Sequence, residues 1–219
     1  MIDTTKILWV PRQELVVCKT FAKEFSNQGF NLRILTRIDS VGSAAIQEFK
    51  TSGADVLVST VSGAALALAQ IPLIRAAKLA GIKLFFPSEY GGVYKDEPNT
   101  SLVQAKKSVL EAAQDVCLPF AVRSNGAFPE YCFTPPFGYD FAERKVTVEE
   151  TVMPRPPGQQ SVLLQTMTIR WLANVLKTIP IEQLQNEHFR IQGNVSIANK
   201  IMELWERKHD LNFRLTTAH

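Results

Sequence analysis

Residues 55–91 read DVLVSTVSGAALALAQIPLIRAAKLAGIKLFFPSEYG and contain one complete repeat of the chain's architecture. The β-branched apolar run at 55–60 predicts a buried strand, and residues 70–80 predict a helix that ends at a glycine. Pro72 falls near the start of that helix, where a missing N–H is tolerated. The apolar run at 83–87 predicts the next strand. Strand, helix and strand in this order predict a parallel sheet.

The same alternation continues on both sides of this stretch. Further strands are predicted at 7–10, 32–36 and 118–123, and further helices at 13–28, 44–51 and 101–116. Together they predict an α/β fold, a doubly wound parallel sheet with helices on both faces. After Tyr131 the pattern changes to proline-rich loops, a helix at 163–177, a short strand at 188–191 and a helix at 196–209. We therefore expect a sheet domain at 1–131 and a small C-terminal α+β lobe at 132–219.

The composition is that of an ordinary globular protein, since 46% of the 219 residues are hydrophobic and 21% are charged, which excludes disorder. A net charge of +3 without a basic cluster predicts no nucleic-acid partner. The cysteines and histidines lack metal-ligand spacing, so no metal site is predicted. Val56–Ile74 is uncharged, but its polar residues and its proline favour strand, turn and helix over a membrane span. Because no signal peptide is recognised, we expect a cytoplasmic protein.

The first strand–helix turn is the phosphate site of a dinucleotide-binding fold, and here it lacks the glycines that such a site uses. The glycine positions fall on Arg12, Leu15 and Cys18, and Pro11 removes an N–H donor. These side chains obstruct the close approach of a pyrophosphate. Arg12 offsets part of this loss if it pairs directly with a phosphate. The alternative is that Arg12 is an exposed loop arginine.

Three more candidate cofactor contacts follow predicted strands, at the edge where ligands bind in parallel sheets. Arg37 follows the second strand, where a cation accommodates the 2′-phosphate of NADP. Asp39 lies nearby in the sequence, and an acidic residue in this region favours NAD over NADP. The alternative is that Arg37 is an ordinary solvated surface charge. Thr60 ends the third strand and Ser88 follows the fourth. Ser88 is placed to orient a nicotinamide or a substrate carbonyl, and Glu89 is expected to order the loop.

Lys106 is the candidate catalytic residue, because its predicted helix places it inside an apolar face. At about 100° per residue, the apolar stripe of this helix consists of Leu102, Val103, Val109, Leu110 and Ala113. Lys106 falls in the middle of the stripe, and Lys107 falls at its margin. A lysine in that position either extends its amine to the surface or directs it into a site. In a site, the amine is suited to proton transfer.

Three segments together resemble the NmrA-like, isoflavone-reductase-like family of atypical short-chain dehydrogenases, in the form found in fungal members. They are DVLVSTV at 55–61, QIPLIRAAKLAGIK at 70–83 and LFFPSEYG at 84–91. The motif Phe-Phe-Pro-Ser-Glu-aromatic-Gly at 85–91 is specific to this group. Lys106 matches the family's catalytic lysine, and NGAFPEY at 125–131 matches the start of its substrate pocket. The resemblance covers residues 54–131 well and the whole chain loosely.

The resemblance implies a Rossmann-like dinucleotide-binding domain that holds NADPH, followed by a small substrate-binding lobe. It implies hydride delivery to a small aromatic or alicyclic substrate, with Lys106 assisting proton transfer and Arg37 on the 2′-phosphate. Only the 17 residues 38–54 separate Arg37 from Asp55, where family members place a helix, a strand and a further helix. We therefore expect one strand–helix unit to be missing and the C-terminal lobe to be truncated.

Three functions stay open at this point. The first is an NADP-dependent reductase of a small molecule in secondary metabolism, which Lys106 favours. The second is a catalytically degenerate regulator or dinucleotide sensor, which the lost glycines favour. The third is a cofactor-independent isomerase or cyclase that keeps the pocket and the lysine. The expected partner is a small-molecule substrate. Neither a nucleic acid nor a membrane is expected as a partner, and a homodimer is compatible with all three functions.

Overall fold

The computed structural model describes residues 6–10, 16–34, 53–61, 66–91, 100–126, 128, 134, 139–149, 160–162, 165–191, 194–196, 198–210, 212 and 214–218. The helix expected at 44–51 lies outside these residues. The chain forms two compact units, and we describe each by itself. Unit 1 consists of residues 1–89, 99–124 and 165–189, and unit 2 consists of residues 90–98, 125–164 and 190–219.

A four-stranded parallel sheet lies at the centre of unit 1. Its strands are β1 (Lys6–Val10), β2 (Asn31–Ile34), β3 (Val56–Ser59) and β4 (Leu84–Phe86), in the order β2-β1-β3-β4. Ile7 of β1 pairs with Leu32 on one side and with Val56 on the other. Beyond β4, Phe120 forms a parallel bridge to Phe85. The predicted parallel sheet is therefore confirmed.

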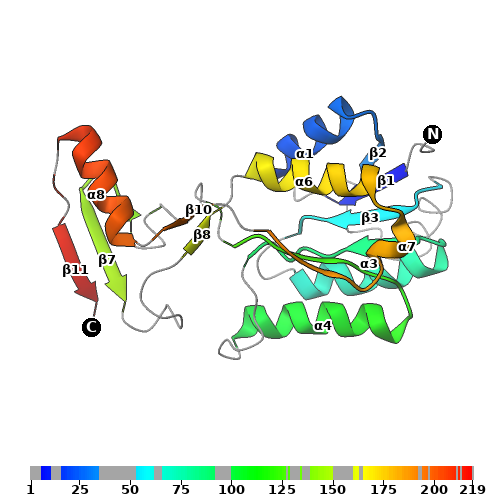
Figure 1. Ribbon diagram of the computed structural model, residues 1–219. Coiled ribbons are helices and arrows are strands. Elements are labelled where there is room, and N and C mark those ends of the chain that lie inside the picture. Colours follow the sequence, from blue (N-terminus) through cyan, green and yellow to red (C-terminus); the bar gives the residue numbers. More distant parts are fainter. Residues whose placement is uncertain are drawn as a thin grey trace. The chain divides into compact units, whose positions relative to one another are not determined.

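Helices cover both faces of this sheet (Figure 1). They are α1 (Val16–Asn27) and α6 (Gln165–Thr178) on one face, and α3 (Leu66–Leu79) and α4 (Ser101–Asp115) on the other. Successive side chains of a strand point to opposite faces. Leu57 and Phe85 therefore pack in the core with α3 and α4, whereas Val58 and Phe86 pack with α1 and α6. Because both faces are covered, β3 and β4 are buried along their whole length.

The chain returns to the edge of the sheet after α4. The strand expected at 118–123 contacts β4 through Phe120 and continues as β5 (Val122–Ser124). β5 lies beside β9 (His188–Arg190), which corresponds to the short strand expected at 188–191, and the short helix α7 (Ile181–Leu184) precedes β9.

Helix α3 begins earlier than expected, so Pro72 lies inside the helix and not near its start. The helix gains four residues before its expected start at residue 70. These residues, Leu66 to Ala69, alternate leucine and alanine, which have high helix propensity. This propensity offsets the hydrogen bond that Pro72 cannot donate to the carbonyl of Leu68. The side chain of Leu68 is 80% exposed, so Leu68 lies on the solvent side of the helix, where an unbonded carbonyl costs least.

The uncharged stretch Val56–Ile74 is divided between β3 and α3, as expected. In the described part of the chain, no helix is both long enough and apolar enough to cross a membrane.

Helix α6 was expected in the C-terminal lobe, but it belongs to unit 1. Ile169 and Leu172 fill the core on the face of the sheet that α1 covers. At the surface, Nε of Arg170 lies 3.0 Å from Oε2 of Glu24 in α1. The physical reason is that α1 alone leaves part of an apolar sheet face uncovered, and the apolar stripe of α6 completes the cover. The domain boundary expected after Tyr131 stays a prediction.

The described residues of unit 2 form short strands and one helix. A three-stranded sheet has the order β11-β7-β6, with β6 (Tyr139–Asp140), β7 (Lys145–Glu149) and β11 (Arg214–Ala218). A second pair is antiparallel and consists of β8 (Gln160–Val162) and β10 (Asn194–Ser196). Helix α8 (Ala198–His209) contacts the chain after β6 through the rings of Trp205 and Phe141, whose centroids are 5.5 Å apart.

Helix α4 begins as the sequence predicts. The hydroxyl oxygen of Thr100 accepts a hydrogen bond from the backbone N–H of Val103 at 3.3 Å, and Thr100 has the extended backbone of an N-cap residue. This bond satisfies one of the four N–H groups that a helix start leaves without partners. The cap therefore defines where α4 starts along the chain.

We expect Thr100→Ala to lower the free energy of unfolding by about 1 kcal/mol, because alanine leaves the N–H of Val103 without its acceptor. Urea denaturation followed by circular dichroism measures this loss. Ser101→Ala is the matched control, since Ser101 is the exposed first residue of the helix and alanine is favourable there. Equal losses in both variants would show that Thr100 does not cap α4.

Candidate functional site

Buried polar residues appear in unit 1 where the apolar strands end. Ser59 ends β3 and Thr60 follows it, and both are buried. Ser88 and Glu89 follow β4, and both are 5% exposed. Because β3 and β4 are adjacent and parallel, their carboxyl ends meet at the same edge of the sheet, which is the ligand-binding edge of α/β folds. The structure thus brings Thr60 and Ser88 to one edge, as predicted from the sequence.

Lys106 reaches this edge from α4. The buried face of the helix consists of Val103, Lys106, Val109 and Ala113. Lys106 is only 4% exposed, whereas the neighbouring Lys107 is exposed. Leu102 was expected in the apolar stripe, but it lies in the first turn of the helix and is 45% exposed. The position of Lys106 on the buried face is confirmed.

Glu89 is the partner of Lys106. Nζ of Lys106 lies 3.3 Å from Oε2 of Glu89, and both side chains are almost fully buried. Burial raises the pKa of the Glu89 carboxyl above its ordinary value, and the nearby charge of Lys106 offsets part of this rise. The amine of Lys106 thus lies beside a carboxylate that binds protons more tightly than usual. Such a buried pair can hold and deliver a proton out of contact with bulk water.

Gln70 holds the chain segment that carries Glu89. Oε1 of Gln70 in α3 accepts a hydrogen bond from the backbone N–H of Ser88 at 2.9 Å. Sequence reasoning missed this contact, and it also missed that Glu89 pairs with Lys106. A signal for Gln70 was present, because its spacing from Leu66 and Leu73 places it on the buried face of its helix, just as the spacing of Lys106 does.

Two further residues are predicted to contact a cofactor. Arg12 and Arg37 lie outside the described residues, as does Leu15 of the loop that lacks glycines. Cys18 lies inside α1. Among the described residues, no group of three or more histidine, cysteine, aspartate or glutamate side chains is placed to hold a metal ion.

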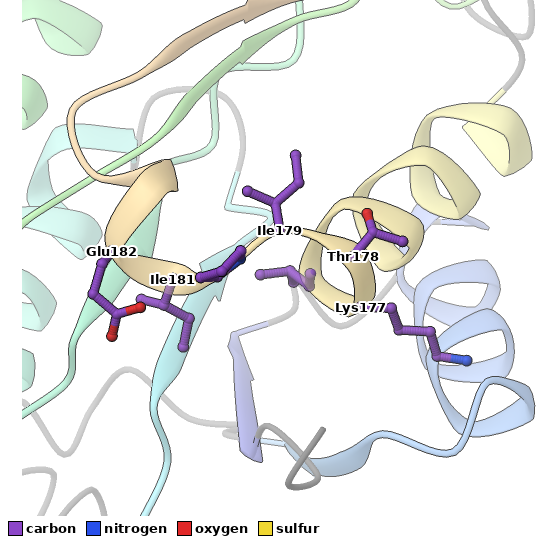
Figure 2. A pocket seen from close by; sticks show the side chains of 7 residues that line it. Lys177, Thr178, Ile179, Ile181 and Glu182 are labelled. Atoms are coloured by element: carbon purple, nitrogen blue, oxygen red, sulfur yellow. The ribbon is translucent and has the colours of Figure 1, made fainter. Parts of the chain in front are cut away.

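A hollow of about 310 Å³ lies elsewhere in unit 1, where α6 ends and α7 begins. Its lining is the continuous segment 176–182. Figure 2 shows the charged side chains of Lys177 and Glu182 pointing away from each other. Because this lining includes none of the buried polar residues at the ends of β3 and β4, the hollow is not the candidate site.

Comparison with known proteins identifies the family. Residues 16–218 match the NmrA-like family. The chain is 28% identical to phenylcoumaran benzylic ether reductase PT1 of Pinus taeda over 171 residues, which are 71% of this chain and 51% of that protein. It is 27% identical to the isoflavone reductase homolog IRL of Zea mays over 179 residues, 74% of this chain and 53% of that protein. The chain thus spans about half the length of these curated relatives.

The fold is also that of solved reductases. Leucoanthocyanidin reductase of Vitis vinifera, solved in a binary complex with NADPH, superposes with a TM-score of 0.78 at 19% identity. The superposition covers 97% of this chain and 76% of the reductase. At this identity the likeness concerns the fold, which is the Rossmann-like fold with its parallel sheet.

The buried pair predicts how stability depends on pH. Lys106→Met removes the cation that offsets the raised pKa of Glu89, so this pKa rises further above its ordinary value of 4.5. The folded variant then binds a proton that the unfolded chain has already released, so stability falls as the pH rises above 4.5. We expect a loss relative to wild type of about 3 kcal/mol near neutral pH and a smaller loss in acid.

Urea denaturation at about pH 5 and about pH 8 measures this dependence. The double variant Lys106→Met with Glu89→Gln should lose the added pH dependence, because the glutamine amide that replaces the carboxyl at position 89 does not titrate. Lys107→Met should resemble the wild type at both pH values. A pH-independent loss in Lys106→Met would mean that Glu89 and Lys106 are not paired in solution.

Proposed function

The chain belongs to the NmrA-like, isoflavone-reductase-like family, and we propose that it is a reductase that uses NADPH to reduce a small-molecule substrate. The observation that carries this proposal is the buried pair of Glu89 and Lys106 at the carboxyl edge of the sheet. Support also comes from the relatives, two of which are named as reductases. A structural neighbour was solved with NADPH.

The topology and the donors of unit 1 fit a dinucleotide. The chain order reverses at β1, which lies between β2 and β3, and such a switch point opens the crevice in which dinucleotides bind. The hydroxyl groups of Thr60 and Ser88 at this edge suit ribose and carboxamide groups. Arg12 and Arg37 would hold the pyrophosphate and the 2′-phosphate, with Arg12 supplying charge where the loop lacks glycine N–H groups.

Lys106 would act as the proton donor in this reaction. When bound, NADPH supplies the hydride. Addition of a hydride to a carbonyl or a conjugated carbon leaves negative charge on another atom of the substrate, such as the carbonyl oxygen. The ammonium of Lys106 would donate a proton to the atom that carries this charge. The carboxylate of Glu89 stabilises the ammonium before the transfer and attracts a replacement proton after it. Burial excludes water from the pair, which strengthens both interactions.

We propose that the substrate is small and aromatic or alicyclic, of the kind found in secondary metabolism. The names of the curated relatives support an aromatic substrate.

We expect Lys106→Met to lower turnover by about 10²–10⁴-fold, the usual worth of a positioned general acid. The measurement is NADPH oxidation with a panel of carbonyl and alkene substrates, at a temperature where the variant is folded. Lys107→Met is the control, because it removes the same charge from an exposed position of the same helix. Its turnover should stay near that of the wild type. If the wild type oxidises NADPH with no member of the panel, the reductase proposal is rejected and a regulator or dinucleotide sensor becomes the leading hypothesis.

Arg37→Ala should weaken the binding of NADPH by about 10- to 100-fold, because a charge-assisted contact to the 2′-phosphate is lost. Binding of NADH, which lacks that phosphate, should change little. Titration calorimetry with both nucleotides measures the difference. Arg75→Ala is the control, since Arg75 is exposed on α3. An equal effect on NADPH and NADH would place Arg37 away from the 2′-phosphate.

A further inference from the structure

An amide side chain is completely buried on the core face of α3. Gln70 is 0% exposed, like the apolar residue Ile74 that follows it by one turn. The same face packs in the core through Leu66, Ala69, Leu73 and Ala77. Burying an amide in such surroundings costs several kcal/mol unless it is hydrogen-bonded. A leucine or methionine would fill this position without that cost. Packing alone therefore does not explain the presence of an amide here.

Both ends of the Gln70 amide have partners. Nε2 donates to the carbonyl of Leu66, one turn earlier in α3, at 3.3 Å. Oε1 accepts from the backbone N–H of Ser88 at 2.9 Å. The first bond fixes the orientation of the amide, and the second bond joins α3 to the segment that follows β4.

The segment after β4 needs such an anchor. β4 ends at Phe86, and Pro87 has no N–H to continue a strand ladder. The N–H of Glu89 donates to the carbonyl of Pro87 at 2.8 Å, which closes a tight turn. The N–H of Ser88 points out of this turn and is held by Gln70. The direction in which Glu89 leaves the turn therefore depends on where Gln70 holds its middle residue.

We propose that Gln70 is a positioning residue for the proton-transfer pair. Through Ser88 it sets the turn from which the carboxylate of Glu89 reaches the amine of Lys106. This inference rests on the proposed function for its effect on turnover, but the positioning itself concerns only the distance between two side chains of unit 1. Helix α3 thus acts on the site through one amide.

The test compares Gln70→Met with the wild type, because methionine keeps the volume and removes both hydrogen bonds. The first readout is the side-chain nitrogen resonance of Lys106 in ¹⁵N-lysine-labelled protein, assigned by its loss in Lys106→Met. We expect this resonance to move toward its position in Glu89→Gln, which removes the carboxylate charge. The second readout is turnover with NADPH, which we expect to fall by about 10- to 100-fold.

Thr168→Val is the matched control. Thr168 is fully buried in α6 of the same unit, and its hydroxyl has no hydrogen-bond partner in the described structure. Its removal should leave both the resonance and turnover unchanged. A folded Gln70→Met variant with the wild-type Lys106 resonance would overturn the proposal. Should this variant fail to fold, Gln70→Asn replaces it, since its shorter side chain withdraws the amide from Ser88 and should shift the same resonance.

The two readouts also separate this inference from the proposed function. A shifted resonance in a chain that reduces no substrate would support the positioning by Gln70 and reject the reductase. An unshifted resonance together with lost turnover would reject the positioning by Gln70 and leave the reductase standing.

Discussion

Two opposite charges are buried together where β4 ends, and their meeting constrains how unit 1 packs. A buried charge without a partner costs several kcal/mol, so Glu89 and Lys106 must face each other. This requirement sets the rotation of α4 about its own axis. If the helix turned by one residue, Lys107 would enter the core and Glu89 would lose its partner. Val103 and Val109 share the buried face of α4 with Lys106.

The apolar scaffold and the polar chemistry are separated along each strand. β3 and β4 are buried on both faces while they run through the sheet, and hydroxyl and carboxyl groups appear only where the strands end. The scaffold therefore stays stable when the polar ends change. This separation is consistent with a fold shared at 19% identity with a solved reductase, since the sheet needs only apolar residues of suitable size.

Residue patterns predicted the sheet, both helix layers and the position of Lys106 on the apolar face of its helix, because each depends on a local period of two or 3.6 residues. They missed what depends on contacts between distant residues. No local pattern joins Glu89 to Lys106 or Gln70 to Ser88, and the stripe of α6 does not say which sheet face it covers. Helix α3 starts before the predicted residue because the leucine and alanine residues from Leu66 to Ala69 extend it on the N-terminal side of Pro72. Arg12 and Arg37 lie outside the described residues.

One face of the sheet is completed by residues that come late in the chain. Val58 and Phe86 pack with α6, which follows residues 125–164 of unit 2. During synthesis on the ribosome, the part of this face that α1 does not cover therefore stays exposed and apolar while residues 125–164 emerge. An exposed apolar sheet face attracts chaperones and other unfolded chains. The late position of α6 in the chain thus leaves the growing polypeptide prone to aggregation until this helix leaves the ribosome.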